Sequence, residues 1–203
     1  MQWAVLGIAI FCLFLIYVVV QGTMAHLKWR EMAAKGDLDI IRRLIDGQME
    51  VWQEMRMPKG EDPHIWRGTQ TAELVSIGPD YARVSCAAEG QYTLVDGQRR
   101  EALSPLEEGM KLTMKLADRF LYDTPNLRLD RVQIDIYTTF RDEGGGAQQR
   151  CILSTIVRRS QAMALDWDAS AHEIVDQLGG RYRLAPWETA LPVEPLAGVE
   201  GVE

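Results

Sequence analysis

A continuous apolar run opens the hydrophobic pattern of the chain. Residues 3–20 carry no charged side chain, and the polar but uncharged residues 21–23 can extend the run. At about 1.5 Å per residue the run spans about 27 Å, close to the thickness of a membrane's hydrocarbon core. We therefore predict a transmembrane anchor over residues 1–23. Its anchoring side chains are Trp3, Phe11, Leu15, Tyr17 and Val20.

A cleaved signal peptide is the alternative to this anchor. Signal peptides begin with a basic segment and have an apolar stretch of only about 7–15 residues. Here no Lys or Arg precedes the run, the run is longer, and Thr23-Met24-Ala25 is a poor match to a cleavage site. The pattern favours an uncleaved signal-anchor in a single-pass membrane protein.

Basic residues follow the run and predict its orientation. Loops rich in Lys and Arg stay on the cytoplasmic side of a membrane. We therefore expect the N-terminus outside the cell membrane and the remainder of the chain in the cytoplasm. The residues behind this prediction are Lys28, Arg30, Lys35, Arg42 and Arg43.

We predict two juxtamembrane helices over residues 24–57. The first continues out of the membrane over residues 24–35 and ends at Gly36, and Asp37 is a good N-cap for the second. The second helix reaches residue 57, before Pro58. Its apolar positions recur at spacings of three and four, which predicts one stripe packed on the domain's own sheet or, as an alternative, a coiled-coil stalk. The stripe includes Ile41, Leu44, Ile45, Met49, Trp52 and Met55.

Residues 58–184 predict an α+β domain. A polar loop over residues 58–68 leads to strands that we place at 69–77, 81–87, 91–95 and 99–103, joined as an antiparallel meander. Alternation of apolar and polar positions supports the second strand, and Asp96-Gly97 is a strong hairpin signal.

A helix and a hairpin follow this meander. Ser104, Pro105 and Glu107 form a capping box that begins a helix over residues 105–122. Strands over 127–140 and 150–158 then form a hairpin, followed by a helix over 169–178 and an edge strand over 181–184. We predict an α+β fold in which helices pack on an antiparallel sheet. Residues 185–203, with prolines, glutamates and no Lys or Arg, predict an extended acidic tail that is free or laid against a partner.

Composition limits the classes of function. The chain has 203 residues, a net charge of -7 and three cysteines. One anchor and one domain fit this length, and an acidic chain without a basic block is a poor nucleic-acid binder. Arg158-Arg159 with Arg181 and Arg183 form a mild basic cluster, either a solvated face or a contact with anionic lipid. Cys86 and Cys151 are expected to be small buried hydrophobes.

The chain carries no strong motif for catalysis or for a cofactor. It has no phosphate loop, dinucleotide fingerprint, nucleophile elbow or Cys-x-x-Cys, so we predict no cofactor. Asp166, Asp168 and His172 are weak candidates for metal ligands. The acids are equally explained as residues that favour a helix N-terminus, so we predict no metal site.

An enzyme hypothesis comes from the order of the later elements. The predicted order αββαβ from residue 105 to residue 184 resembles the core of restriction-endonuclease-like nucleases. This resemblance implies Asp130 or Asp135 as a first metal-binding acid. The next strand, residues 150–156, has neither the acid nor the lysine that such a site needs. We therefore predict a protein without catalytic residues and keep a membrane-bound hydrolase as the third hypothesis.

Three features resemble the nuclear-transport-factor-two-like cone fold. They are the Gly36-Asp37 break before an amphipathic helix, the meander, and Tyr137-Thr138-Thr139-Phe140-Arg141-Asp142 on a late strand. Within that group they resemble the bacterial relatives of the matrix-side adaptor of the mitochondrial inner-membrane translocase. The resemblance covers residues 30–158 at most. It implies a protein of the bacterial inner membrane that binds partners or lipid.

Two functions can be compared on these grounds. The first is a non-enzymatic accessory, assembly or tethering subunit, whose partners are the lipid bilayer and other integral membrane proteins of a larger complex. It predicts an exposed apolar patch and an ordered tail. The second is a membrane-tethered ligand- or lipid-binding domain. It predicts a conical pocket lined by Trp52, Trp66 and Tyr137.

Overall fold

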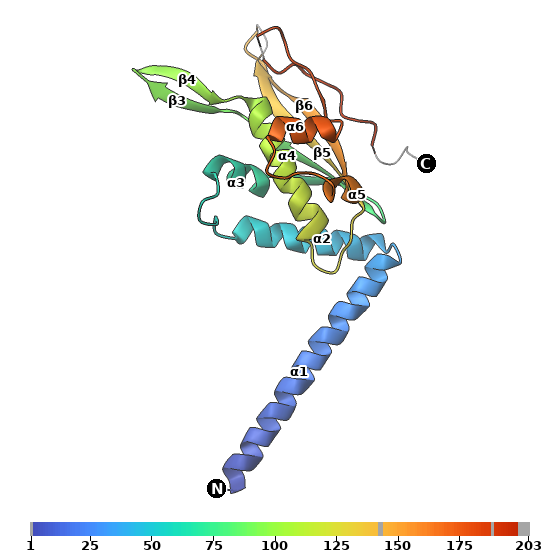
Figure 1. Ribbon diagram of the computed structural model, residues 1–203. Helices are drawn as coiled ribbons and strands as arrows, with labels where there is room; N and C mark the ends of the chain where they lie inside the picture. Colours follow the sequence, from blue (N-terminus) through green and yellow to red (C-terminus); the bar gives the residue numbers. More distant parts are fainter. Residues whose placement is uncertain (1, 142–143, 188, 199–203) are drawn as a thin grey trace.

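A long helix projects from an α+β domain in the computed structural model, which describes residues 2–141, 144–187 and 189–198 (Figure 1). This helix is α1 (Gln2–Ala34). Its residues Ile10–Ala34 are long and apolar enough to cross a membrane by length and composition, and the apolar window is not buried against the domain. No other helix among the described residues passes this test.

A glycine and a capping aspartate separate α1 from α2 (Leu38–Glu54). Gly36 adopts a φ of +81°, a backbone conformation that ends a helix readily only when the residue is glycine. The Asp37 side chain accepts a hydrogen bond from the backbone N–H of Ile40, so it is the predicted N-cap. The helix then buries Ile41, Ile45 and Trp52 against the domain.

The segment expected to be a polar loop contains a further helix, α3 (Pro63–Gln70). Asp62 accepts from the N–H groups of His64 and Ile65, at 2.8 and 3.4 Å. Pro63 occupies the first turn, where its missing N–H costs nothing. The loop prediction was wrong because an aspartate before a proline begins a helix as well as it forms a turn.

The main sheet has the strand order β1-β2-β5-β6-β7. It is mixed rather than antiparallel as expected, because β2 and β5 pair in parallel. Helix α4 (Pro105–Tyr122) crosses over the sheet between these two strands and returns the chain to the same end. The strands are β1 (Glu73–Ile77), β2 (Tyr81–Ala87), β5 (Arg131–Arg141), β6 (Ala147–Arg158) and β7 (Arg181–Tyr182).

Strands β3 (Gln91–Val95) and β4 (Gln98–Leu103) form a separate two-stranded sheet. Asp96 and Gly97 have φ values of 52° and 75°, so the predicted hairpin turn is confirmed. The hairpin projects away from the domain at the end remote from α1 (Figure 1). The expectation that these strands continue a single meander was therefore wrong.

The two faces of the main sheet have different covers. Val132, Ile134 and Ile136 of β5 are fully buried on the face that α4 covers. Gly109 lets α4 approach closely, since a Cβ there would lie 2.8 Å from Ile136. Helices α5 (Arg159–Ala162) and α6 (Ala171–Gln177) complete the helical elements of the described chain. The alternate residues of β5, Gln133, Asp135 and Tyr137, point to the opposite face.

One end of the domain lies against α1. The Nδ2 atom of Asn126 is 3.2 Å from Nδ1 of His26, six residues beyond Val20. A Cβ at Gly36 would lie 3.3 Å from Pro79, which precedes β2. The starting ends of β2 and β5 therefore lie at the α1 end of the domain, and their far ends lie away from it.

Candidate functional site

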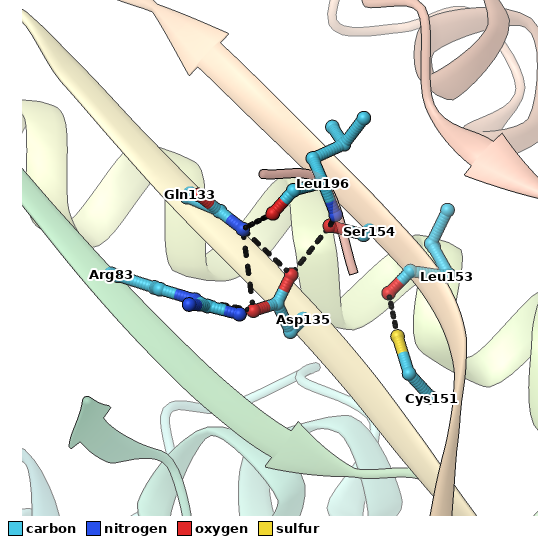
Figure 2. Close-up of polar contacts among 7 residues, drawn as sticks. All are labelled: Arg83, Gln133, Asp135, Cys151, Leu153, Ser154 and Leu196. Atoms are coloured by element: carbon cyan, nitrogen blue, oxygen red, sulfur yellow. Dashed lines mark hydrogen bonds and ion pairs between the residues drawn. The ribbon is translucent and has the colours of Figure 1, made fainter. Parts of the chain in front are cut away.

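A buried carboxylate lies at the centre of the sheet face that α4 does not cover (Figure 2). Asp135 is only 1% exposed. Its Oδ2 accepts from Nε of Arg83 at 2.7 Å, and its Oδ1 accepts from Oγ of Ser154 at 2.5 Å. Arg83 lies on β2 and Ser154 on β6, and β5 lies between them. The register of the three strands therefore brings these side chains together.

The C-terminal segment closes this network. Nε2 of Gln133 donates to Asp135 at 3.2 Å and to the backbone oxygen of Leu196 at 3.1 Å. The backbone N–H of Leu196 donates to Oγ of Ser154 at 2.9 Å (Figure 2). One residue of the tail thus makes a hydrogen bond on each side of the carboxylate.

Further backbone bonds hold the same segment along the sheet. The N–H of Leu191 donates to the carbonyl of Arg183, and the N–H of Val193 donates to the carbonyl of Cys151, each at 2.9 Å. Residues 191–196 therefore lie on the domain's own sheet. The sequence pattern predicted an extended tail that is free or laid against a partner, and for this segment that prediction was wrong, because its backbone groups bond to the chain's own sheet.

The two acids implied by the nuclease resemblance, Asp130 and Asp135, have different environments. Asp135 accepts from three side chains and is covered by the tail, so its buried charge is paired and hydrogen-bonded. Asp130 is exposed, and its backbone carbonyl accepts from the N–H of Arg159. Their carboxylates do not share the network shown in Figure 2.

The three weak metal candidates do not converge on one point. Oδ1 of Asp166 accepts from the backbone N–H of Asp168 at 3.1 Å. Nε2 of His172 lies 3.5 Å from Oδ2 of Asp176 and 3.4 Å from the hydroxyl of Tyr182. The described residues contain no cluster of three or more His, Cys, Asp and Glu that could hold a metal ion.

The residues expected around a conical pocket lie on two faces of the sheet. Trp52 and Trp66 are buried on the helical side, where the guanidinium of Arg119 lies 5.3 and 4.6 Å from their ring centroids. Burial lowers the pKa of Arg119, and its Nη1 donates to Oγ1 of Thr69. Tyr137 lies on the opposite face and lines a different hollow.

The anchor and juxtamembrane residues lie outside the domain core. Phe11, Leu15, Tyr17 and Val20 are exposed along α1, and Trp3 lies in α1 but its side chain is outside the described part. Lys28 and Arg30 are exposed near the C-terminal end of α1, Lys35 is exposed just after it, and Arg42 and Arg43 are exposed on α2. Lys35 pairs with Glu31 at 2.7 Å.

A large hollow lies at the end of the domain remote from α1. Its volume is about 1040 Å³, and it is bounded by the β3–β4 hairpin, the start of α4, the end of β5 and the residues Leu184, Trp187, Thr189 and Ala190. Trp187 is 77% exposed beside it, and Tyr92 and Leu184 also present large exposed surfaces. We call this hollow with its rim the distal cleft.

The sequence interpretation missed most residues of both features. Arg83, Gln133 and Ser154 carry no local signal, because their role depends on strands that are distant in sequence. Trp187 had a detectable signal, since a lone tryptophan in an acidic, proline-containing tail has no helix or strand pattern to explain it.

Comparisons with known proteins add no relative to this description. No family model, no curated protein and no solved structure matches the chain. The function is therefore argued from the residues and surfaces above.

Proposed function

We propose that this protein is a single-pass, membrane-anchored accessory or tethering subunit of a larger membrane complex, and that it is not an enzyme. Helix α1 crosses the cell membrane, with its N-terminus outside and the α+β domain in the cytoplasm. The partners are the bilayer and other integral membrane proteins of the complex.

The observation that carries this proposal is the apolar surface around the distal cleft. Trp187 is 77% exposed and Leu94, on the adjoining hairpin, is 79% exposed. Large apolar side chains gathered on a surface that no membrane covers are typical of protein–protein contacts. The domain buries a continuous core elsewhere, and its other large exposed apolar side chains, such as Val75 and Met163, lie on different elements.

The hairpin offers backbone as well as side chains to a partner. In the described structure β3 and β4 form a ladder only with each other, so no other described strand pairs with the outer edge of β4. An extended segment of a partner can add to such an edge while its side chains enter the neighbouring cleft. We assign this role to a cytoplasmic segment of a membrane protein in the same complex.

Helix α1 supports the tethering role by its length. It continues for fourteen residues after Val20, or about 21 Å, before it ends at Ala34. The domain contacts this extension at His26 through Asn126, and its distal cleft lies at the opposite end of the domain. Such an arrangement suits contact with a partner's cytoplasmic part.

The ligand-pocket alternative has less support from the geometry. It needs Trp52, Trp66 and Tyr137 around one cavity, and they lie on opposite faces of the sheet. The enzyme hypothesis would place Asp135 against a substrate, but this side chain is paired and covered.

Extraction from native membranes tests the proposal. The full chain is solubilised in mild detergent and separated on a native gel, and the co-migrating proteins are identified by mass spectrometry. We expect migration with a large assembly, which Trp187→Asp combined with Leu94→Asp abolishes. Met163→Asp is the matched control, because Met163 is 69% exposed but lies outside the distal cleft. Migration of the unaltered chain at monomer or dimer size contradicts the proposal.

A further inference from the structure

A second hollow lies between β6, β7 and the C-terminal tail. It has a volume of about 600 Å³, which is within the range of small-molecule sites. Arg150, Arg181 and Arg183 line it, and Glu194 is the one carboxylate among its described lining residues. In a chain with a net charge of -7, this is a local excess of positive charge. We call it the arginine hollow.

The charges of these arginines are not neutralised within the described structure. Arg150 donates from Nε and Nη2 to the amide oxygen of Gln148, at 3.1 and 2.8 Å. Nη1 of Arg181 donates to the backbone carbonyl of Glu194 at 3.4 Å. None of the three arginines, Arg183 included, forms an ion pair with a residue that the structure describes. The partners of Arg150 and Arg181 are neutral, so they orient these guanidinium groups and leave their charge available.

The remaining walls suit an anion that carries hydrogen-bond acceptors. Gln149 supplies an amide and Tyr137 a phenol, and burial raises the pKa of Tyr137 so that it remains a donor at neutral pH. Val193 and the prolines beside it form an apolar wall, which excludes water from one side and strengthens the attraction between charges.

The arginine hollow also differs from the surroundings of Arg158 and Arg159, the other two members of the basic cluster noted in the sequence. Arg158 and Arg159 lie in a separate hollow of about 430 Å³ that also contains Asp80 and Asp130. There Arg131 is paired with Asp80 at 3.5 Å. The positive charges around Arg158 and Arg159 are therefore partly compensated, whereas those of the arginine hollow are not.

The position of the hollow indicates that its ligand comes from water rather than from the bilayer. Arg131, at the α1 end of the sheet, pairs with Arg158, whereas Arg150 pairs with Thr138. Seven residues of strand separate Arg131 from Thr138, which is about 23 Å. The arginine hollow thus lies toward the end of the sheet that is remote from the membrane.

From these contacts we infer that the arginine hollow binds a small soluble molecule bearing a phosphate or diphosphate group. Guanidinium groups match phosphate oxygens in pairs of parallel hydrogen bonds, and Arg181 and Arg183, with Arg150 on the bordering strand, favour a multiply charged anion. This site shares no residue with the distal cleft, and it does not depend on the proposed subunit role.

Calorimetric titration of the full chain in zwitterionic nanodiscs with inorganic pyrophosphate tests this site. We expect saturable binding that Arg181→Gln with Arg183→Gln weakens by at least about tenfold, because each charged hydrogen bond contributes that much. The matched control is Arg42→Gln with Arg43→Gln, which removes the same charge from α2. These arginines are exposed, and unchanged thermal unfolding of each variant shows that it folds.

Three results would overturn the inference. The first is no saturable binding of pyrophosphate. The second is equal weakening by the two double variants, which indicates a response to net charge alone. The third is binding of citrate as tight as that of pyrophosphate, which indicates carboxylate recognition. Attachment to phosphatidylglycerol vesicles through Arg181 and Arg183, without pyrophosphate binding, would show that the site binds a lipid headgroup and not a small soluble molecule. A negative result for pyrophosphate does not affect the native-gel test of the subunit role, since that experiment alters none of the residues of the arginine hollow.

Discussion

The two faces of the main sheet are closed by different physical means. On the α4 face, apolar side chains such as Ile134 and Leu116 are fully buried, and the cover is a helix with its own capping box. On the other face, the central side chain is a carboxylate, and the cover is an extended tail joined by hydrogen bonds. The first face is stabilised by removal of apolar surface from water, and the second by pairing of groups that are costly to bury alone.

The comparison extends to two buried carboxylates. Asp135 on the tail face has an arginine as its partner at 2.7 Å. Glu108 on α4 is also buried, but its Oε2 accepts from the backbone N–H of Gly90 at 2.7 Å. Burial raises the pKa of Glu108, because a neutral donor compensates the charge less than an arginine does. A buried charge is therefore tolerated on either face, but only the tail face pairs it with an opposite charge.

Asp135→Ala is expected to have the largest effect. It leaves the buried Ser154 and the partly buried Arg83 without their acceptor, so the free energy of unfolding falls by about 3–5 kcal/mol. Urea unfolding of the full chain in detergent, followed by tryptophan fluorescence, measures this change. The control is Asp80→Ala, because Asp80 is exposed and its pair with Arg131 contributes less than about 1 kcal/mol. Equal costs for the two variants would refute the structural role of the network.

Leu116→Ala tests the helical face with a smaller expected loss. Leu116 is fully buried on α4, and its truncation leaves a cavity that costs about 3 kcal/mol. We expect the same cost in a chain that ends at Leu191, because the removed residues Val193 and Leu196 are bonded along the other face. If removal of the tail changes the cost, the two faces are not independent, as double-mutant analysis of the unfolding curves will show.

Ending the chain at Leu191 tests the tail cover itself. The loss of the bonds made by Val193 and Leu196 is expected to reduce the free energy of unfolding by about 1–2 kcal/mol. It also admits water to Asp135, so Asp135→Ala then costs less than in the full chain. Unfolding in urea of the four combinations measures this coupling, and additive costs would contradict it.

The same truncation has a chemical readout. Burial raises the pKa of both Cys86 and Cys151 to about 12, so neither thiol reacts readily in the full chain. Cys151 lies on the tail face, whereas Cys86 donates to the carbonyl of Gly68 among the helices. We expect faster alkylation of Cys151 by iodoacetamide after truncation and an unchanged rate at Cys86, which peptide mass spectrometry will resolve. Equal acceleration at both would indicate general loosening.

Glu108→Gln is expected to have the smallest effect, and it depends on pH. The folded protein binds the Glu108 proton more tightly than the unfolded chain does, so stability is greatest below the unfolded pKa. It falls as the pH rises from that value through the raised folded pKa. The glutamine variant lacks this fall and is more stable above the window by less than about 1 kcal/mol. Thermal unfolding across this pH range tests the sign, and a variant less stable at neutral pH would contradict it.

Much of the local structure could be predicted from neighbouring residues. The capping box at Ser104 and Glu107 begins α4, Ser170 and Glu173 form another at α6, and Asp96-Gly97 forms the hairpin turn. These signals act over two to four residues, so they work wherever the chain goes afterwards. The burial of Cys86 and Cys151 was also predicted, from apolar neighbours alone.

The sites were harder to predict because their members meet across strands. Asp135 was singled out as an acid on a strand, but its arginine partner is 52 residues away in sequence. Ser154 and Leu196 are brought to it by strand register and by the course of the tail. The arginine hollow likewise joins β6 to β7, and it separates Arg181 and Arg183 from the Arg158-Arg159 pair with which sequence order had grouped them.

By itself, the sequence determined the long apolar helix, the caps and turns, the α+β class and the apolar stripes, because each follows from interactions between near neighbours or from hydrophobic periodicity. Only the tertiary structure decided the parallel pairing of β2 with β5, the separation of the β3–β4 hairpin, and the placement of the tail over Asp135. These features depend on contacts between residues distant in the chain. Their free energy comes from burial and pairing in the folded protein, which no local pattern records.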